Sequence, residues 1–206
     1  MKNYYRLMLG KGSMHAQECF DGNFVGVDFR INEDLTNKFP DQWRDFNKAY
    51  IPVFLESFPD KTKIAAGLAC GALWTVGREM QLGDIVLCPD GKGQYYVGEI
   101  TGDYKYQPGG NLPHRRPVQW LKKTINRADM GEVLKAATGG PGTKSNISSY
   151  GEEIKMLIGG EKIAKLFSTD ETIEDPIAFA MEKHLEDFLV KNWASTELSK
   201  DYDIYE

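Results

Sequence analysis

Residues 83–120 read GDIVLCPDGKGQYYVGEITGDYKYQPGGNLPHRRPVQW, and this stretch decides the class of fold. Three runs rich in β-branched and aromatic residues alternate with glycine-marked turns, which is typical of sequential antiparallel strands. The Asp90-Gly91 pair favours a hairpin between the first two runs. From Lys105 to Trp120 the stretch has three cationic side chains and no acidic one. Because rings stack on an unpaired base and cations neutralise its phosphate, this stretch favours nucleic-acid binding.

The elements predicted around this stretch mix strands with helices. Alternation and turn residues predict strands over residues 4–9, 24–29, 85–88, 94–101 and about 114–123. Apolar spacing near 3.6 residues predicts helices over residues 13–20, 41–57, 61–80, 129–137 and 150–158. We expect Ser13 to cap the first helix, Pro52 to kink or split the second, and Gly26 to mark a close approach within a strand. The pattern predicts an α+β fold, a small, curved, partly open β-barrel with flanking helices and a C-terminal helical extension.

The composition changes after Asp129, and this change sets the expected domain boundaries. Residues 159–176 read as a polar, acidic linker that ends in an Asp-Pro pair. Residues 177–193 predict a strongly amphipathic helix whose apolar face needs a partner, which could be a second copy of the chain in a homodimer. We therefore expect a first domain over residues 1–158, the linker, and the start of a second domain over residues 177–206.

Composition and charge indicate a soluble protein with one more basic part. Hydrophobic residues make up 41% of the chain and charged residues 27%, which is ordinary for a globular protein. The net charge is −5, yet residues 1–127 carry 17 Lys and Arg against 14 Asp and Glu. This asymmetry allows a basic binding face on the first part, although the acidic part could equally be solvated helix surface. No apolar run is long enough for a signal peptide or a membrane span, so we expect a cytoplasmic protein without a membrane partner.

Three cysteines, Cys19, Cys70 and Cys88, form no Cys-x-x-Cys pair. Cys70 and Cys88 lie in apolar runs and read as small buried hydrophobes of a reducing compartment. His15 and Cys19 are four residues apart, but one such pair is not a metal site. We therefore expect no metal and no cofactor.

Two motifs resemble catalytic signatures without meeting their requirements. The run GGPGTKS at residues 139–145 lacks the glycine before lysine that a phosphate loop needs, so residues 139–149 read as a flexible connection. Glu153, Ile154 and Lys155 match half of a nuclease pattern, but that pattern needs a strand and a second acid, and these residues fall in a predicted helix. Three histidines yield no nucleophile triad. We expect no catalytic residue in the first domain.

The aromatic residues could form a pocket for a ligand. On a strand of alternating facing, Tyr104 and Tyr106 point the same way and Tyr95 and Tyr96 point oppositely. One arginine of the His-Arg-Arg run should share the face of these rings. Any single ring could be buried in the core, but two or three of them together could form a cage around a ligand.

Three segments together suggest a family. They are YYRLMLGKGS at residues 4–13 with FVGVDF at 24–29, ALWTVGREMQLGDIVLCPDGKGQYYVGEITGDYKY at 72–106, and PHRRPVQWL at 113–121. In order and spacing they resemble the PUA-like superfamily, and within it the EVE-like domains that lead modification-dependent restriction endonucleases. The resemblance covers about residues 2–125 and continues more weakly to about residue 160. It implies a small β-barrel that accepts a flipped, modified base of duplex DNA in an aromatic pocket, where stacking and hydrogen bonds repay the cost of flipping.

The resemblance also implies roles for particular residues. The pocket walls would be Phe29, Trp74, Tyr104 and Tyr106; Asp28 or Asp103 would accept a proton of an exocyclic amine; and Lys11, Lys105, Arg115 and Arg116 would contact phosphates. The chain departs from the family in lacking a second tryptophan close to Trp74, which affects the composition of the cage. Two other hypotheses stay open, an RNA-binding PUA-like module and a domain that binds a nucleotide or another small ligand.

The end of the chain has a resemblance of its own. Residues 176–206, PIAFAMEKHLEDFLVKNWASTELSKDYDIYE, resemble the first helix and entry strand of a PD-(D/E)XK nuclease domain. The resemblance implies that Glu186 is the acid contributed by the first helix. The strands with the other acids, which would bind Mg²⁺, are expected after Glu206. We therefore expect that this sequence is either a fragment of a longer restriction enzyme or a reader whose catalytic part was lost, and that it does not cut DNA by itself.

Overall fold

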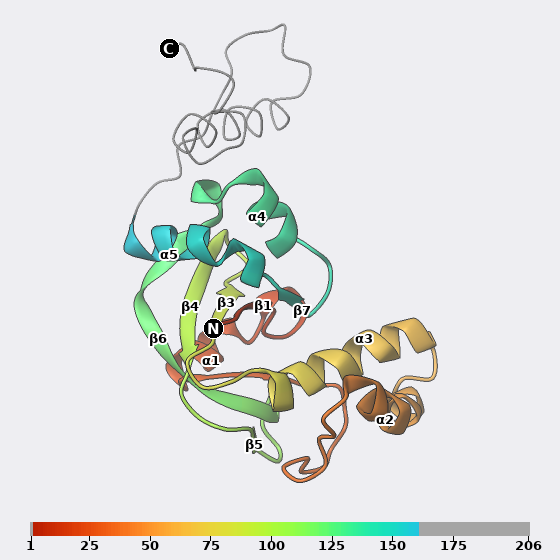
Figure 1. Cartoon of the computed structure of the whole chain (residues 1–206). Helices are drawn as coiled ribbons and strands as arrows, with labels where there is room; N and C mark the ends of the chain where they lie inside the picture. Colours follow the sequence, from red (N-terminus) through yellow and green to blue (C-terminus); the bar gives the residue numbers. More distant parts are fainter. Residues whose placement is uncertain (1, 161–206) are drawn as a thin grey trace, which may run out of the picture. The chain divides into compact units, whose positions relative to one another are not determined.

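A curled seven-stranded sheet lies at the centre of the protein, with strand order β2-β6-β4-β3-β1-β7 and β5 paired to β6. The computed structural model describes residues 2–160 (Figure 1). The predicted linker beyond residue 160, the predicted helix over residues 177–193 and Glu186 lie outside the described residues. The strands are β1 (Tyr4–Leu7), β2 (Phe24–Val27), β3 (Ile85–Pro89), β4 (Gln94–Ile100), β5 (Lys105–Tyr106), β6 (His114–Asn126) and β7 (Lys144–Asn146).

Five α-helices accompany these strands in the described part of the chain. They are α1 (Ala16–Asp21), α2 (Trp43–Ser57), α3 (Lys63–Trp74), α4 (Glu132–Thr138) and α5 (Gly151–Gly159), and a π-helical turn (Thr75–Glu79) continues α3. Helices α4 and α5 lie at one end of the sheet, and α2 and α3 lie at the other (Figure 1). The α+β class and the curved sheet, which closes to about a half-barrel, are confirmed. Among residues 2–160, no helix has both the length and the apolar composition that a membrane span requires.

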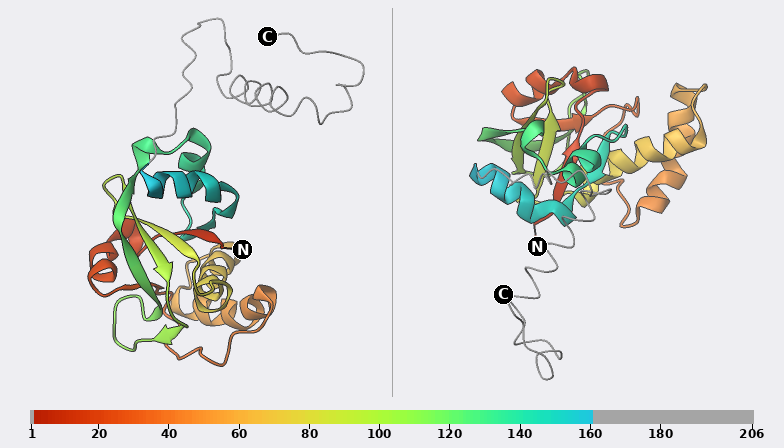
Figure 2. Two further views of the ribbon diagram at one scale, coloured as in Figure 1. Left: turned by 60° about the vertical axis from the view of Figure 1, so that its left-hand side comes forward. Right: turned by 90° about the horizontal axis from the view of Figure 1, so that it is seen from above.

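The long strand β6 curls the sheet because its two halves have different neighbours. Residues 114–117 pair antiparallel with β2, and the beginning of the strand also pairs with β5. Residues 118–126 pair antiparallel with β4, whose register shifts between Tyr96 and Gly98. A bulge of this kind bends the strand and increases its twist. The first half of β6 is therefore turned toward α2 and α3, while the second half runs toward α5 (Figure 2).

Both faces of the sheet are covered, so two apolar cores form. Val86 and Cys88 of β3 lie in a first core with α1, α2 and α3, whereas Ile85 and Leu87 lie in a second core with α4 and α5. Tyr95 and Tyr96 likewise belong to opposite cores, as the alternation predicts. A strand buried on both faces reads as a continuous apolar run, which explains the sequence of β3.

Helices α2 and α3 form a hairpin that extends away from the sheet (Figure 2). Thr62 caps α3 by accepting a hydrogen bond from Ala65 N at 3.2 Å. The two helices are joined by a hydrogen bond from Asn47 Nδ2 to the Gly67 carbonyl at 3.1 Å. Of the two expected effects of Pro52, a kink or a split, the split does not occur, because α2 runs unbroken from Trp43 to Ser57. Pro52 lies on the exposed side, where water can solvate the carbonyl that its missing N–H leaves unbonded.

Two further expectations about connections need correction. Ser13 does not cap α1, because its backbone has a positive φ of 65° and its side chain makes no capping bond; α1 begins three residues later. Residues 139–149 are not simply a flexible connection, since β7 within them pairs antiparallel with β1. The predicted turn at Asp90 is confirmed, and Asp90 Oδ1 accepts from Lys92 N and Gln94 N at 2.6 and 3.0 Å.

Gly26 is a point of close approach within the sheet, as its place in a strand predicts. A Cβ atom there would lie 2.8 Å from the His114 carbonyl oxygen and 3.0 Å from that of Leu112. We expect Gly26→Ala to lower the free energy of unfolding by about 1–3 kcal/mol, because the β2–β6 pairing must shift to admit a methyl group. Chemical denaturation followed by circular dichroism measures this loss.

Gly71→Ala is the matched control. Gly71 lies inside α3, and no neighbouring atom lies within 4 Å of the position that an added methyl group would occupy. The same substitution should therefore stabilise the protein by about 0.5–1 kcal/mol through lower chain entropy. Equal effects at the two glycines would contradict the close-approach argument.

Candidate functional site

A cavity of about 510 Å³ lies where the loop after β1 meets the end of β2, and we call it the β1–β2 cavity. Its walls are Met8, Gly10, Lys11, Gly12, Val27, Asp28, Phe29, Leu112, Pro141, Gly142 and Thr143. Three of the predicted site residues, Lys11, Asp28 and Phe29, therefore meet at one opening although they come from separate segments. Typical ligand sites measure about 300–1,000 Å³, so the volume suits a small ligand or one base.

The backbone turns sharply around this cavity. Gly10 and Gly12 have φ of 79° and 61°, and the loop closes through His15 N, which donates to Leu9 O at 3.0 Å. Leu112 on another wall also has positive φ, 48°, which is unusual for a leucine. Left-handed conformations at residues other than glycine store strain and cluster at ligand sites.

The far wall of the cavity is held by β1. Met8 N donates to Thr143 O at 2.8 Å, and the buried Arg6 donates through Nη1 to the Gly142 carbonyl. The glycine-rich segment that resembles a phosphate loop is thus fixed as a wall of the β1–β2 cavity. The pairing of β7 with β1 determines its position, and a glycine-rich composition by itself does not reveal that pairing.

The predicted base-contacting residues occupy distinct places in this wall. Phe29 is half-buried, with its ring centroid 6.3 Å from that of Phe54. The exposed Asp28 accepts a hydrogen bond from Arg30 N through Oδ1 at 2.8 Å, which orients the carboxylate. Lys11 is exposed in the loop after β1. The cavity therefore combines an aromatic wall, an acceptor and a cation.

A second cavity of about 470 Å³, which we call the Arg116 cavity, holds three other predicted residues. Its walls are Thr36, Asn37, Phe39, Gly77, Arg78, Gln81, Asp103, Tyr104 and Arg116. Asp103, Tyr104 and Arg116 are thus brought together, but away from Phe29 and Asp28. The two cavities share no lining residue.

Tyr104 is held by a buried chain of hydrogen bonds. Its hydroxyl accepts from Leu35 N at 3.3 Å and donates to His114 Nδ1 at 2.7 Å, while His114 Nε2 donates to the Ile31 carbonyl at 2.7 Å. These partners require a neutral imidazole with its proton on Nε2. Burial raises the pKa of Tyr104 and lowers the pKa of His114. The ring of Tyr106 lies 5.3 Å from that of His114, on the same face as Tyr104.

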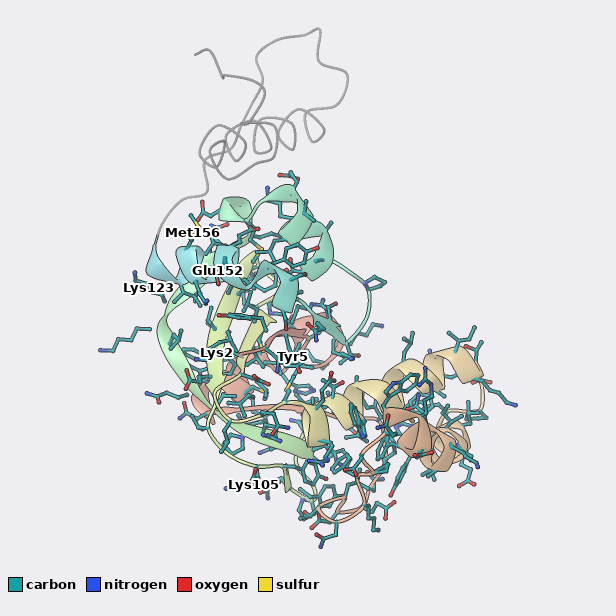
Figure 3. The ribbon with its side chains drawn as sticks, in the orientation of Figure 1. Lys2, Tyr5, Lys105, Lys123, Glu152 and Met156 are labelled. Carbon is teal, nitrogen blue, oxygen red and sulfur yellow. The ribbon has the colours of Figure 1, made fainter. Side chains whose placement is uncertain are left out.

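The two adjacent arginines have opposite surroundings. Arg115 donates through Nε to Leu112 O and through Nη2 to Asn111 O at 3.0 and 2.7 Å, and its guanidinium lies 3.8 Å from the Phe24 ring centroid. It therefore holds the loop before β6. Arg116 points to the other face, lines the Arg116 cavity and is only 4% exposed. Lys105, the first residue of β5, is exposed (Figure 3).

Trp74 does not share a cavity with the other predicted rings. Its indole Nε1 donates to Pro40 O at 2.9 Å, and the ring lines a groove with Trp43 and Leu68 between α2 and α3. The expected single cage of Phe29, Trp74, Tyr104 and Tyr106 is therefore wrong. The sequence could not show this, because the rings lie on different faces of elements whose packing is not local.

The remaining candidate groups have structural partners. Glu153 lies on α5, as the helical reading predicts, and accepts from Gly131 N at 2.8 Å. Burial raises the pKa of Cys19 to about 12 and that of Cys70 to about 11, so these thiols stay protonated at neutral pH. Within residues 2–160 no three His, Cys, Asp or Glu side chains gather as metal ligands.

Residues 5–138 match the model of a protein family described as a domain of unknown function (DUF8426). The chain belongs to this family. The match reaches the end of α4, so it includes both arginines of β6 and most walls of the two cavities, but not Pro141, Gly142 and Thr143. A search of curated proteins finds no match. The family description names no activity, so the chemistry must be argued from the cavities.

The buried His114 makes stability depend on pH. The unfolded chain has an ordinary histidine pKa of 6.5, and burial lowers the folded value. Between these two values the unfolded state binds more protons, so the free energy of unfolding should fall as pH drops below about 6.5, by at most about 1.4 kcal/mol per pH unit from this group. Urea unfolding at a series of pH values measures this slope.

His114→Gln should be less stable than the wild type at pH 8, because the Tyr104 and Ile31 partners are lost. The stability difference between the two proteins should shrink as the pH falls through the range in which His114 titrates. Parallel pH profiles would show that His114 does not carry the dependence.

Proposed function

We propose that this protein binds duplex DNA that carries a modified base and accepts the flipped base in the β1–β2 cavity. One observation carries the proposal: Lys11, Asp28 and Phe29, to which the family resemblance assigns phosphate, base-edge and stacking contacts, line one cavity of about 510 Å³. A flipped base needs these three kinds of contact at once.

Each wall has a part in this proposal. The Phe29 ring stacks on the base, while Met8, Val27 and Leu112 exclude water from its face. The Asp28 carboxylate accepts a hydrogen bond from an exocyclic amine of the base. Among the described residues its Oδ1 accepts from Arg30 N, which leaves Oδ2 for the base. The glycines at positions 10, 12 and 142 let the sugar and phosphate approach the backbone closely.

The resemblance to EVE-like domains supports the same assignment. The residues that carry it include the loop after β1 and the end of β2, which are the two segments that meet at the cavity. In this proposal the curled half-barrel is a PUA-like barrel, and the chain acts as the recognition module of a modification-dependent restriction endonuclease. DNA reading thus directs a nuclease toward the modified strand.

The exposed lysines are the phosphate contacts of the proposed complex. Lys11 stands in the cavity wall and Lys105 on β5, and both are exposed. Arg115 is left out of the proposed interface, because its donors bind the carbonyls of Leu112 and Asn111.

Binding of duplexes that differ in one base tests the proposal. We expect the protein to bind a duplex with 5-methylcytosine, 5-hydroxymethylcytosine or N6-methyladenine more tightly than the unmodified duplex, as measured by fluorescence anisotropy. Phe29→Ala should remove about 1–3 kcal/mol of stacking energy and most of the preference. Phe20→Ala is the matched control, because Phe20 is also a half-buried ring but stacks on Tyr96 outside the cavity.

Equal affinity of the wild type for all duplexes would refute base reading. Tighter binding of single-stranded RNA than of any duplex would replace it with the RNA-binding hypothesis. An unchanged preference in the Phe29 variant would move the reading site elsewhere.

Salt dependence tests the proposed role of Lys11. If Lys11 contacts one phosphate, Lys11→Ala should weaken binding to all duplexes alike and reduce the slope of log K against log salt concentration by about 1. Lys155→Ala on α5 is the control and should leave the slope unchanged. Identical slopes for both variants would exclude a Lys11–phosphate contact.

A further inference from the structure

Arg116 is a buried charge that lacks a partner. Its side chain is 4% exposed, and its Nε atom has no hydrogen-bond partner among residues 2–160. Burial lowers the pKa of Arg116, and the negative charges of Asp103 and Asp84 act in the opposite direction. Native proteins pair nearly all buried polar groups, and each exception calls for an explanation, of which a water molecule or an ion is one.

Neighbouring arginines show that this is not a general property of the fold. Arg115, one residue away, donates to two loop carbonyls. Arg6 is also buried and its Nε likewise has no partner among the described residues, but its Nη1 donates to the Gly142 carbonyl, so this guanidinium is bonded to the protein. Of these three guanidinium groups, that of Arg116 is the one that lines a cavity while making no hydrogen bond to the described residues.

The Arg116 cavity supplies further groups for an anion. Arg78 stands in its wall with half of its side chain exposed, and Nη2 donates to Asp41 at 2.9 Å while other donors remain. Thr36, Asn37 and Gln81 add hydroxyl and amide groups. A planar guanidinium fork matches the oxygens of phosphate in a bidentate manner.

The cavity is larger than a bare anion and has other features. The rings of Phe39 and Tyr104 line it, with centroids 5.0 Å apart. The carboxylate of Asp103 would repel a wholly anionic ligand, so the ligand should also offer hydroxyl or amine donors to it. A phosphate joined to a sugar and a base has all three features: anion, donors and an aromatic plane.

A π-helical turn builds the ring-bearing wall. Gly77 lies in the π-helical turn Thr75–Glu79, and a Cβ atom on it would lie 1.9 Å from Cζ of Phe39. Phe39 therefore packs directly on the backbone of the turn and stays in place beside Tyr104. Single π-helical turns occur frequently at functional sites, which agrees with a ligand site here.

We propose that the Arg116 cavity is a second binding site, which takes the phosphate of a nucleotide unit with Arg116 as its buried anchor and Arg78 at its mouth. The proposal does not rest on base reading, because the two cavities have no residue in common. The phosphate can belong to a free nucleotide or to a nucleic-acid strand, and the experiment separates these sources.

Thermal unfolding and calorimetric titration of the full chain test the site. The probes are inorganic phosphate, the four nucleoside 5′-monophosphates, the corresponding nucleosides, succinate and a short unmodified duplex. A ligand that binds the folded state raises the melting temperature, and the stabilisation grows with the logarithm of its concentration relative to Kd. Arg116→Gln should lower the affinity for the bound phosphate probe at least about tenfold, while leaving the free protein as stable as the wild type or more stable, because an unpaired buried charge is removed.

Arg78→Gln keeps the test valid if the buried substitution prevents folding. It should lower the affinity for the same probe several-fold. Arg44→Gln is the control and should leave this affinity unchanged, because Arg44 is exposed and lies over the ring of Trp43 outside the cavity.

The outcomes divide clearly. If the wild type binds a nucleoside monophosphate and Arg116→Gln abolishes this binding, the ligand is a free nucleotide. If no mononucleotide binds and Arg116→Gln weakens only the binding of the duplex, the ligand is the phosphate of a nucleic-acid strand. Stabilisation by succinate equal to that by nucleotides, or wild-type affinity in both arginine variants, overturns the proposal. Neither result depends on Phe29, so the Phe29→Ala protein should respond to nucleotides like the wild type.

Discussion

The pairing of β6 with three neighbours is the constraint on which the rest of the described structure depends. Its first half is paired to β2 and β5, and its second half to β4. The missing side chain of Gly26 permits this pairing, because the carbonyl oxygens of His114 and Leu112 lie 2.8 and 3.0 Å from the place that a Cβ atom would take. The sheet that results separates the two cores, which lie on its opposite faces, and cavities lie where loops leave it.

Alternation along β6 gives two adjacent arginines unrelated tasks. Arg115 points to the face of Phe24, and its guanidinium stabilises the loop of residues 107–113 by hydrogen bonds to two carbonyl groups. Arg116 points to the face of His114 and Tyr104, where it stays charged at the wall of a cavity. A guanidinium is difficult to deprotonate even when burial opposes its charge. The protein therefore keeps a desolvated cation in place, which a ligand anion can neutralise.

The two cavities differ in how their walls are stabilised. Backbone bonds and glycine turns hold the β1–β2 cavity, whose groups are mostly apolar. Side-chain networks hold the Arg116 cavity, in which Tyr104 is locked by His114 and Phe39 by the π-helical turn. An apolar slot suits a planar base, whereas a polar pocket with a buried cation suits a phosphate group. The division matches the two proposals, each of which uses one cavity.

Local pattern in the sequence was sufficient for most elements. The continuous apolar run of β3, the Asp90 turn, the opposite facing of Tyr95 and Tyr96, and the burial of Cys70 and Cys88 follow from periodicity and turn chemistry, which act between near neighbours in the chain. The meeting of Lys11 with Phe29 was expected only through the family resemblance.

Only the tertiary structure decided which side chains share a cavity. Trp74 lies in a separate groove. The pairing of β7 with β1 makes Gly142 a wall of the β1–β2 cavity. Arg116, and not Arg115, lines the Arg116 cavity. Each of these results depends on contacts between segments distant in sequence, whose register is set by close approaches such as that at Gly26. Side-chain periodicity reports the face on which a residue lies, but not what that face meets.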